Sequence, residues 1–402
     1  MGCDDNQKLI SSKQCLDFLT NQAQVLEKID KVSLKNAVGR ILAIDLIAGI
    51  SVPEFDNSAM DGYAINLPTK PKPPYSFDLV GRIAAGEVGG ELLVGQAAKI
   101  FTGAKMPKGG NCVAIVERSS DVDGKVEIFG VLKKGENIRP KGDDIKQGEV
   151  ILKAGKKLTP SDIGLCASIG ISEIVVFAKV KIGVFFSGDE LVEPDEKLVD
   201  GKIYNSNRYT ITTLLTAMNF ELIDIGNIAD DFDLTVKTLD SLSTKCDVII
   251  TTGGVSVGEE DHIKPAVEKL GSIEMWAIKM KPGKPLAYGK VNQTHFVGLP
   301  GNPVSALATL HLFIAPFLRK MSGEQNYNNK TTKVQIGFGV GSRFRREFMR
   351  VRLDNSTIPP TAIAFKNQSS GVLSSMSWAD GLLEIPDETI IKKGDFLDYY
   401  GF

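Results

Sequence analysis

The chain has 402 residues, of which 43% are hydrophobic and 24% are charged, and its formal net charge at pH 7 is −2. This composition is typical of a folded protein with several domains, and the charge argues against a general nucleic-acid-binding surface. No run approaches the roughly 20 consecutive apolar residues of a membrane span, and the N-terminal stretch lacks the basic and apolar regions of a signal peptide. The five cysteines are scattered singly, which favours free thiols in a reducing cytoplasm.

The first part of the chain predicts a helix followed by β structure. Apolar residues at helical spacing predict a helix over residues 13–30, and an extended stretch follows it. Short apolar runs broken by glycine predict an all-β module over about 75–135. Capping residues around Pro160, with a glycine at the end, predict a short helix over residues 158–171.

From residue 179 the pattern changes to alternating strands and helices. The strands are predicted at "KVKIGVFFSG", "ELIDIG", "CDVIITTGG" and "HFVGLPG". Such alternation predicts a doubly wound parallel sheet. A further helix should begin after "LPG", with Asn302 as its N-cap and Pro303 at its first position. Residues 322–333 are polar and predict a linker, and the remaining short strands predict another small β module.

The stretch "TTGGVSVGEEDH", residues 251–262, combines two features that conflict electrostatically. Its glycines and serine, Gly253, Gly254, Ser256 and Gly258, suit a backbone wrapped around an anion, yet three acidic residues follow at once. The stretch lies between a predicted strand and a predicted helix, where α/β sheets bind their ligands. A cation bound with the anion would resolve the conflict. The alternative is that the glycines only form a tight turn, because neither a Walker loop nor GxGxxG is present.

A second acidic stretch, "FSGDELVEP", ends the first strand of the same unit. Glu190 should therefore emerge at the same edge of the sheet as Asp261, with Asp230 near them. Oxygen ligands of this kind, completed by water and substrate phosphates, suit Mg²⁺. For each acid taken alone, helix capping or solvation is the alternative role.

Two basic stretches suggest a site for an oxyanion. "KMKPGKPL" places Lys279, Lys281 and Lys284 around a Pro-Gly turn, which limits the entropy lost in presenting lysines to an anion. "RFRREFMRVRL" has five arginines in residues 343–352, and guanidinium groups suit tetrahedral oxyanions. The alternative for the second stretch is a solvated strand with alternating arginines.

Seven motifs occur in one order along the chain. They are "DNSAMDGYAI", "IFTGAKMP", "IRPKGDDIKQGEVIL", "SGDELVEP", "TTGGVSVGEEDHIK", "MKPGKPLAYGK" and "GLPGNPVSAL". From about residue 8 to the C-terminus, the chain closely resembles the molybdopterin molybdenumtransferases, the MoeA and gephyrin E-domain family of molybdenum cofactor synthesis. Seven ordered motifs are far more specific than any one of them.

The resemblance implies an α/β fold of four domains. An elongated linking domain would use residues 1–50 and 142–177, with a mostly-β domain, 51–141, inserted into it. The doubly wound domain, 178–324, would be MogA-like and would bind molybdopterin. A C-terminal β domain would span residues 328–402.

The resemblance also implies an activity and partners. The reaction would insert molybdate into adenylylated molybdopterin, with Mg²⁺ needed, and would release AMP and Mo-molybdopterin. Family members are elongated homodimers with the active cleft at the dimer interface. A cytoplasmic homodimer is therefore expected, with the molybdopterin adenylyltransferase as a candidate partner and with no nucleic acid or membrane partner.

Matching the family pattern residue by residue assigns roles to positions of this chain. The catalytic groups of the cleft would be Asp61, Thr102, Asp144, Glu190, Asp230 and Asp261, with Arg139 nearby. Molybdate would be held by Lys281, Lys284, Ser305, Arg350 and Ser370. The "LPGNP" loop would be shaped by Pro300 and Pro303. The pterin phosphate would lie at Gly253, Gly254, Ser256 and Gly258, and Mg²⁺ at Glu190 and Asp261.

Two other functions remain open from the sequence. A molybdopterin adenylyltransferase shares the doubly wound domain, but it needs neither the additional modules nor "KPGKP". A non-catalytic dimeric scaffold is the other alternative, and the acidic rim argues against it, since unused clustered acids destabilise a protein. The chain departs from the family pattern at His262, where an aromatic residue is frequent, and at Ala277, where a basic residue sometimes stands.

Overall fold

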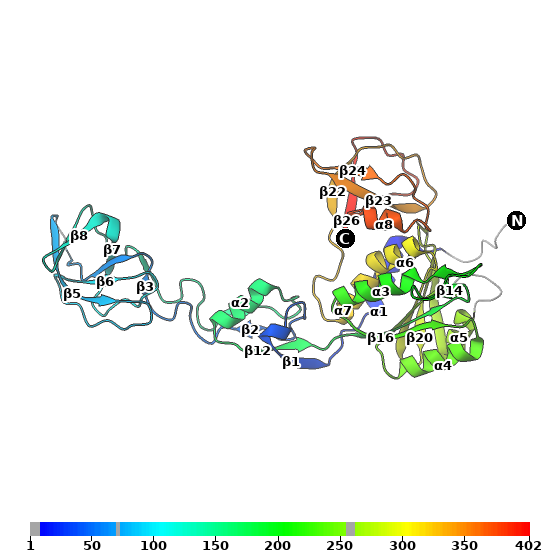
Figure 1. Ribbon diagram of the computed structural model, residues 1–402, viewed down its shortest axis with the longest axis horizontal. Helices are drawn as coiled ribbons and strands as arrows, with labels where there is room; N and C mark the ends of the chain where they lie inside the picture. Colours follow the sequence, from blue (N-terminus) through cyan, green and yellow to red (C-terminus); the bar gives the residue numbers. More distant parts are fainter. Residues whose placement is uncertain (1–8, 70–72, 255–261) are drawn as a thin grey trace.

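The computed structural model describes residues 9–69, 73–254 and 262–402, without the side chain of Trp276. The molecule is elongated (Figure 1): a β module lies at one end, and a narrow waist joins it to a doubly wound unit that carries a second β module. The chain passes through the waist twice. Strand β1 (Ile29–Ser33) belongs to the first passage and pairs antiparallel with β12 (Glu173–Phe177) of the second. The distal β module is therefore an insertion between two strands of the waist.

The doubly wound unit is built on one sheet. Its strand order is β16 (Glu221–Ile228), β13 (Lys181–Ser187), β17 (Val248–Thr252), β21 (Thr294–Leu299), β20 (Pro285–Val291) and β18 (Gly271–Ala277). The pairings from β16 to β21 are parallel, as predicted. However, β20 pairs antiparallel with both β21 and β18. The four predicted strands form this parallel part of the sheet. Strands β20 and β18 were not predicted, and they add an antiparallel edge because a tight turn at Asn292, with φ 53°, joins β20 directly to β21.

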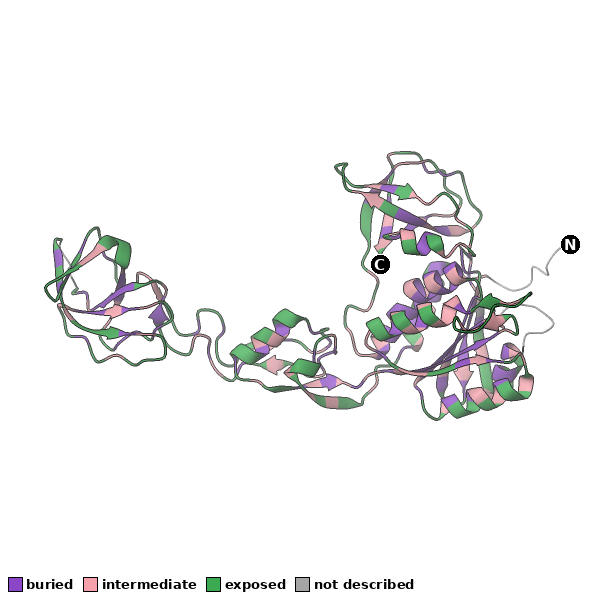
Figure 2. Cartoon of the chain, in the orientation of Figure 1, coloured by how far each residue is buried: buried purple, intermediate pink, exposed green. Residues whose placement is uncertain are grey.

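Helices cover both faces of this sheet. On one face, α4 (Phe232–Ser243) and α5 (Ile263–Leu270) close a core that contains Phe185 and Ile249. On the other face, α3 (Ser206–Ala217) lies beside the helix after β21, and Val184 and Ile250 belong to that core. Neighbouring residues of a strand thus enter different cores, as the pleat requires. Figure 2 shows buried positions on the inner side of these helices and exposed positions outside.

Helix α1 (Ser12–Gln22) packs on the doubly wound unit. Its residues Cys15 and Leu19 are wholly buried in the larger core, against the helix that follows β21. A helix was predicted over residues 13–30, and this prediction is too long. The chain leaves the helix after Gln22, and residues 29–33 become a strand because β12 offers a partner far along the sequence.

The helix after β21 is apolar and central. It consists of α6 (Pro303–Thr309), one π-helical turn (Leu310–Ile314) and α7 (Ala315–Met321). By length and composition alone, the span Pro303–Met321 is apolar enough to cross a membrane, but most of it is buried inside the protein. Its apolar surface is buried against the sheet and against α1, which is the arrangement of a core helix.

The waist has a small core of its own. β2 (Leu46–Ile47) pairs with β11 (Val150–Leu152), and the short 3₁₀ helix η1 (Leu34–Asn36) lies beside α2 (Pro160–Ser168). Thr159 caps α2: its Oγ1 accepts from the amide of Asp162, whose carboxylate accepts the amide of Thr159 at 2.9 Å. The short helix predicted at this point is confirmed.

The distal module is all β, as predicted. Its sheet has the order β7 (Cys112–Ile115), β4 (Gly62–Ile65), β6 (Gln96–Ile100), β5 (Tyr75–Ile83), β9 (Lys125–Ile128) and β8 (Ser119–Val122). A 3₁₀ turn, Val116–Arg118, separates β7 from β8. A short ladder of β3 (Asn57–Ser58) and β10 (Ile138–Arg139) lies where the chain enters and leaves the module.

The C-terminal module is a barrel-like sheet that includes one strand from the doubly wound unit. Its order is β19 (Met280–Lys281), β23 (Arg346–Asp354), β24 (Thr361–Ala364), β22 (Thr332–Ile336), β26 (Phe396–Gly401) and β25 (Gly381–Ile385), and a further β23–β25 pairing curls it. With α8 (Ser374–Trp378), it packs against the doubly wound unit, because Phe348, Met376 and Leu382 share the larger core with α1.

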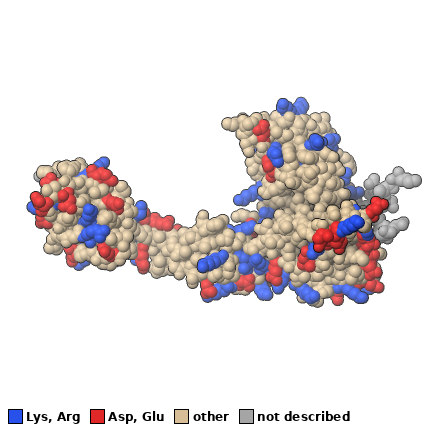
Figure 3. Space-filling model, in the orientation of Figure 1, with Lys and Arg blue, Asp and Glu red and all other residues tan. Residues whose placement is uncertain are grey.

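The described cysteines are free thiols, as expected. Cys15, Cys112, Cys166 and Cys246 are all buried, and burial raises the pKa of each thiol. Each is therefore a small apolar side chain of its core. On the surface, Figure 3 shows acidic and basic side chains interspersed over the displayed face, in keeping with the net charge of −2.

Gly62 of the "DGYAI" motif provides a test of the distal module. A Cβ atom at Gly62 would lie 1.9 Å from the carbonyl oxygen of Ala114 on β7. We expect Gly62→Ala to destabilise the module by about 1–3 kcal/mol, because the pairing of β4 with the edge strand β7 must open. Thermal unfolding together with amide hydrogen exchange of β4 and β7 measures the effect.

Gly81→Ala in β5 is the matched control, since its Cβ would meet no atom of the described residues within 4 Å. The steric account is wrong if the two alanine variants exchange their amide hydrogens equally fast.

Candidate active site

Four loops converge at the carboxyl edge of the doubly wound sheet. A Cβ atom at Gly253, which follows β17, would lie 2.3 Å from the carbonyl oxygen of Ser187, the last residue of β13. A Cβ at Gly301, after β21, would lie 3.9 Å from the Cα of Gly253. Gly253 also has a φ of 82°, so both its conformation and its surroundings require glycine. The backbone is thus bare at the edge where α/β sheets bind ligands.

Carboxylates gather at the ends of β13 and β16. Asp230 accepts a hydrogen bond from the Ser187 hydroxyl, and it exchanges backbone-to-carboxylate hydrogen bonds of 3.2 Å with Asp189. Glu190 folds back over Gly188, where a Cβ would lie 2.7 Å from its Oε2. The predicted Glu190 and Asp230 therefore lie in one rim. Asp189 of the same motif belongs to this rim through its hydrogen bonds with Asp230.

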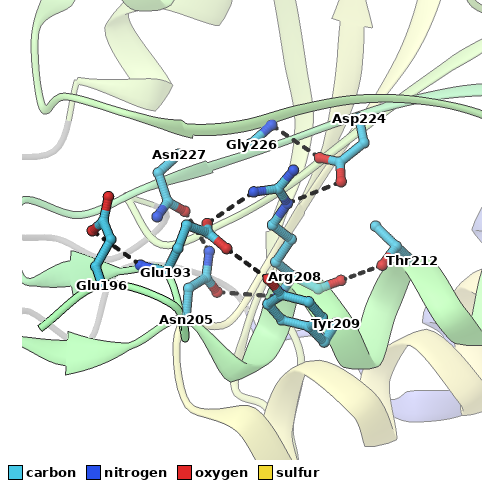
Figure 4. Close-up of polar contacts among 9 residues, drawn as sticks. All are labelled: Glu193, Glu196, Asn205, Arg208, Tyr209, Thr212, Asp224, Gly226 and Asn227. Atoms are coloured by element: carbon cyan, nitrogen blue, oxygen red, sulfur yellow. Dashed lines mark hydrogen bonds and ion pairs between the residues drawn. The ribbon is translucent and has the colours of Figure 1, made fainter. Parts of the chain in front are cut away.

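Arg208 ties the segment that carries Glu190 to the sheet (Figure 4). Its Nε donates to Asp224 Oδ2 at 2.9 Å, and its other end lies 2.9 Å from Glu193 Oε1. The hydroxyl of Tyr209 donates to Glu193 Oε2, also at 2.9 Å. Hydrogen bonds to Asp224 and then to Glu193 raise the pKa of Arg208. Helix α3, strand β16 and the segment after β13, including β14 (Leu191–Val192) and β15 (Ile203–Tyr204), are thus held together.

The start of α3 closes the site from another side. Asn205 is the N-cap and accepts the amide of Arg208 at 3.0 Å. Asn207 donates to the carbonyl oxygen of Gly301 at 2.7 Å, which joins α3 to the "LPGNP" loop. Sequence reasoning did not single out either asparagine. The polar run "YNSNR" at the predicted helix start was the available signal.

Part of the predicted anion loop lies outside the described residues. Gly253 and Gly254 are described, both with positive φ, whereas Ser256, Gly258 and Asp261 are not. Within residues 9–69, 73–254 and 262–402, no group of three or more His, Cys, Asp or Glu residues forms a preformed metal site.

The "KPGKP" loop lies at the same edge of the sheet. Strand β20 runs antiparallel to β21, so Pro285 begins it where the parallel strands end. Gly283 has a φ of 103°, and a Cβ on it would lie 2.6 Å from Thr309 Oγ1 and 3.6 Å from the carbonyl oxygen of Ser305. The predicted turn therefore packs on α6. Lys281 and Lys284 are exposed on either side of a buried Pro-Gly pair.

Arg350 is buried close to the beginning of α6. Its Nε donates to Ser375 Oγ at 3.1 Å and one NH₂ group donates to the carbonyl oxygen of Ser369 at 3.2 Å. The other terminal nitrogen, NH1, has no hydrogen-bond partner among the described residues. Burial lowers the pKa of Arg350 to about 10. Next to this group, Ser370 accepts the amide of Val304 at 3.1 Å.

The predicted start of α6 is confirmed: Asn302 occupies the N-cap position and Pro303 the first position. Among the described residues, the Asn302 side chain makes no capping hydrogen bond. The amide of Val304, one of the two that such a cap could bind, donates to Ser370 instead. The buried Pro300 completes the predicted loop.

The remaining predicted residues lie in the distal module and beside it. Asp61 accepts from the amide and the hydroxyl of Thr102, at 2.8 and 2.9 Å, and these bonds lower the pKa of Asp61. Arg139 pairs with β3, and the amide of Asp144 donates to Val52. Figure 1 places this module at the opposite end of the molecule from α3 and β14. A single chain therefore does not bring the two sets together.

The described histidines do not form a catalytic triad with a serine. His295 and His311 are partly buried in different places, and desolvation lowers the pKa of each to about 4. His295 Nδ1 lies 2.7 Å from the hydroxyl of Tyr288, within the core. Both are structural side chains.

Three family models match consecutive parts of the chain. They are described as "MoeA N-terminal region (domain I and II)" at residues 10–170, "Probable molybdopterin binding domain" at 183–320, and "MoeA C-terminal region (domain IV)" at 340–402. The doubly wound unit corresponds to the second model, and the barrel-like module to the third.

Known proteins are similar over most of this length. A molybdopterin molybdenumtransferase of Haemophilus influenzae is 38% identical over 79% of each chain, and one of Staphylococcus aureus is 30% identical over 94% of this chain and 91% of its own. The crystal structure of a molybdopterin biosynthesis moeA protein of Pyrococcus horikoshii superimposes with a TM-score of 0.85 and 30% identity, over 98% of this chain and 100% of that one. The chain therefore belongs to the MoeA family of molybdopterin molybdenumtransferases.

Proposed function

We propose that this protein inserts molybdate into adenylylated molybdopterin and releases AMP and Mo-molybdopterin. The observation that carries the proposal is the meeting of three kinds of groups at one sheet edge. Carboxylates lie at the ends of β13 and β16, bare glycine backbone follows β17, and lysines leave the sheet before β20. This order along the edge suits a substrate whose phosphate lies between a bound cation and a bound oxyanion.

The glycine backbone would hold the phosphate of the nucleotide-linked pterin. Gly253 and Gly254 present amides without side chains, and the start of α3 lies beside them through Asn207 and Gly301. Exposed amides and helix N-termini favour anions. The other residues assigned to this loop, Ser256 and Gly258, lie outside the described residues.

The donor chemistry of the acidic rim fits Mg²⁺. Glu190, Asp230 and the Ser187 hydroxyl offer hard oxygen atoms in one place, and Asp261 is assigned to the same ion. Mg²⁺ commonly completes its ligands with water and substrate phosphates, so a few protein oxygens suffice. When bound, the ion would neutralise phosphate charge and so favour the departure of AMP.

The molybdate ligands would come from both sides of the start of α6. Lys281 and Lys284 diverge from the turn at Gly283, and Arg350 has an unpartnered NH1. Ser305 and Ser370 lie at the beginning of the same helix. Ammonium, guanidinium and hydroxyl groups from different directions suit a tetrahedral dianion.

The distal residues require a second chain. Asp61, Thr102, Asp144 and Arg139 would complete the cleft only if the distal module of one protomer approaches the doubly wound unit of another. The proposal therefore includes a homodimer, acting in the cytoplasm. One assay tests the whole: AMP release from adenylylated molybdopterin on addition of molybdate. An adenylyltransferase would consume ATP instead, and a scaffold would release nothing.

Glu190→Gln should lower turnover about a hundredfold without unfolding the protein, because it removes one charged ligand of the metal. The rate of AMP release at limiting Mg²⁺ measures this. Glu196→Gln is the control, since Glu196 belongs to the same segment and its side chain accepts the Glu193 amide, at 3.3 Å. Wild-type turnover by Glu190→Gln at limiting Mg²⁺ would remove this residue from the metal site.

Lys284→Ala should weaken molybdate binding about ten- to hundredfold, because one charge-assisted hydrogen bond is lost. Binding of the adenylylated pterin should change little, since its phosphate lies at the glycine backbone. Separate titrations with the two ligands test this, with Lys290→Ala at the far end of β20 as control. An equal loss for both ligands would mean that the lysine serves the nucleotide.

Mixing two inactive variants tests the shared cleft. Asp61→Asn and Asp230→Asn should each be inactive, yet subunit exchange between them should restore about a quarter of wild-type AMP release. Half of the dimers would then be mixed, and one of the two sites in each would be intact. If both residues acted within one chain, the mixture would stay inactive.

A further inference from the structure

Glu347 is a buried carboxylate where the "KPGKP" loop meets the C-terminal module. Only 3% of the residue is exposed. Its Oε1 lies 2.9 Å from Lys281 Nζ and its Oε2 lies 3.3 Å from Arg343 Nε. The side chains of Lys281 and Arg343 are 48% and 50% exposed. An inner carboxylate therefore holds two cations that remain open to solvent.

The fold fixes this pair in place. Strand β19 runs parallel to β23 with Lys281 in register with Glu347, so the two side chains are cross-strand neighbours. The other side of the loop is fixed at Gly283, which packs against Thr309. A buried carboxylate without a partner is strongly unfavourable, so Glu347 keeps the Lys281 ammonium beside it when no other anion is present.

The charge of Glu347 also reaches Arg350. Burial lowers the pKa of Arg350, and the nearby Glu347 acts in the opposite direction. Thus one carboxylate influences two of the cations assigned to the oxyanion, Lys281 by contact and Arg350 through the field. A site that gathered several cations without such a charge would bind any dianion tightly and release it slowly.

We propose that Glu347 is the internal counter-ion of the oxyanion site. It holds Lys281 while the site is empty, competes with the incoming oxyanion for the same ammonium, and so sets the affinity for tetrahedral dianions. The inference rests on the proposed function, since it takes Lys281 as an oxyanion ligand. Glu347 acts through Lys281 and is a positioning residue, not a catalytic one.

The test is calorimetric titration of Glu347→Gln with molybdate and, separately, with sulfate. Gln keeps the shape of the side chain but cannot compete as an anion, so both dianions should bind about tenfold more tightly than to the wild type. Simple structural damage predicts the opposite, a loss of affinity. Unchanged or weaker binding by Glu347→Gln overturns the proposal.

Glu384→Gln is the matched control. Glu384 lies on the adjacent strand β25, pairs with Arg346 at 2.8 Å and accepts the Tyr400 hydroxyl at 2.7 Å, but it does not contact Lys281 in the described structure. Its affinity for both dianions should equal that of the wild type. An equal gain in affinity in Glu384→Gln would show that the effect comes from the net charge of the module, and it would overturn a specific role of Glu347.

A double variant tests whether Lys281 carries the effect. In a Lys281→Met background, Glu347→Gln should tighten dianion binding much less than it does in the wild type, because only its field at Arg350 remains. An undiminished gain there overturns the proposal. If Glu347→Gln does not fold, Glu347→Asp replaces it. The shorter side chain withdraws the carboxylate from Lys281, so a smaller gain, about threefold, is expected, and a loss overturns the proposal.

Sulfate separates this inference from the proposed reaction. If Glu347→Gln binds sulfate more tightly but the protein never releases AMP, the counter-ion role of Glu347 is supported and the proposed insertase activity is refuted. Molybdate-dependent AMP release by the wild type, without any gain in Glu347→Gln, would sustain the insertase and refute the counter-ion.

Discussion

The arrangement of the candidate site depends on close contact at the first two turns of α6. Gly283 approaches Thr309 so closely that a methyl group would lie 2.6 Å from the threonine hydroxyl. On the other side, the amide of Val304 donates to Ser370 of the C-terminal module. A single helix end therefore fixes the lysine loop and the serine loop relative to the sheet. These contacts use no charged side chain, so they do not occupy the lysines of the loop or Arg350.

Much of the fold could be predicted where the pattern is local. Apolar periodicity identified the parallel strands and most helices, and Thr159 capped its helix as its type and position suggested. The differences from prediction occur where contacts with distant segments of the chain determine the local structure. Residues 29–33 leave the predicted helix because β12 pairs with them. Asn302 occupies the predicted N-cap of α6, but its side chain makes no capping hydrogen bond to the described residues, and the amide of Val304 donates to Ser370 instead. Thr159 and Asn302 look alike in sequence, and only the tertiary contact distinguishes them.

The candidate site was predictable to a similar extent. Residues at strand ends were correctly placed together, since parallel strands end at one edge: Glu190 and Asp230 share a rim that also includes Asp189. The Arg208 network was missed because its partners come from three elements with no common motif. The order of the motifs could not predict that Asp61 lies far from this rim, because motif order carries no information on distance. It follows from the waist, whose two antiparallel strands hold the inserted module away from the sheet.

The strand order explains how one edge can contain both an anion site and a row of carboxylates. Across the sheet, the acids end β16 and β13, the bare glycines follow β17, and the lysine loop joins β18 to β20 beyond β21. Carboxylates and lysines are thus kept apart by two intervening strands, about 5 Å each. Opposite charges that were adjacent would neutralise one another, as Lys281 and Glu347 do at the far side. Because uncharged backbone separates them here, the edge is negatively charged at one end and positively charged at the other. A substrate complex that carries a cation at one end and an oxyanion at the other would align with this difference in charge in one orientation.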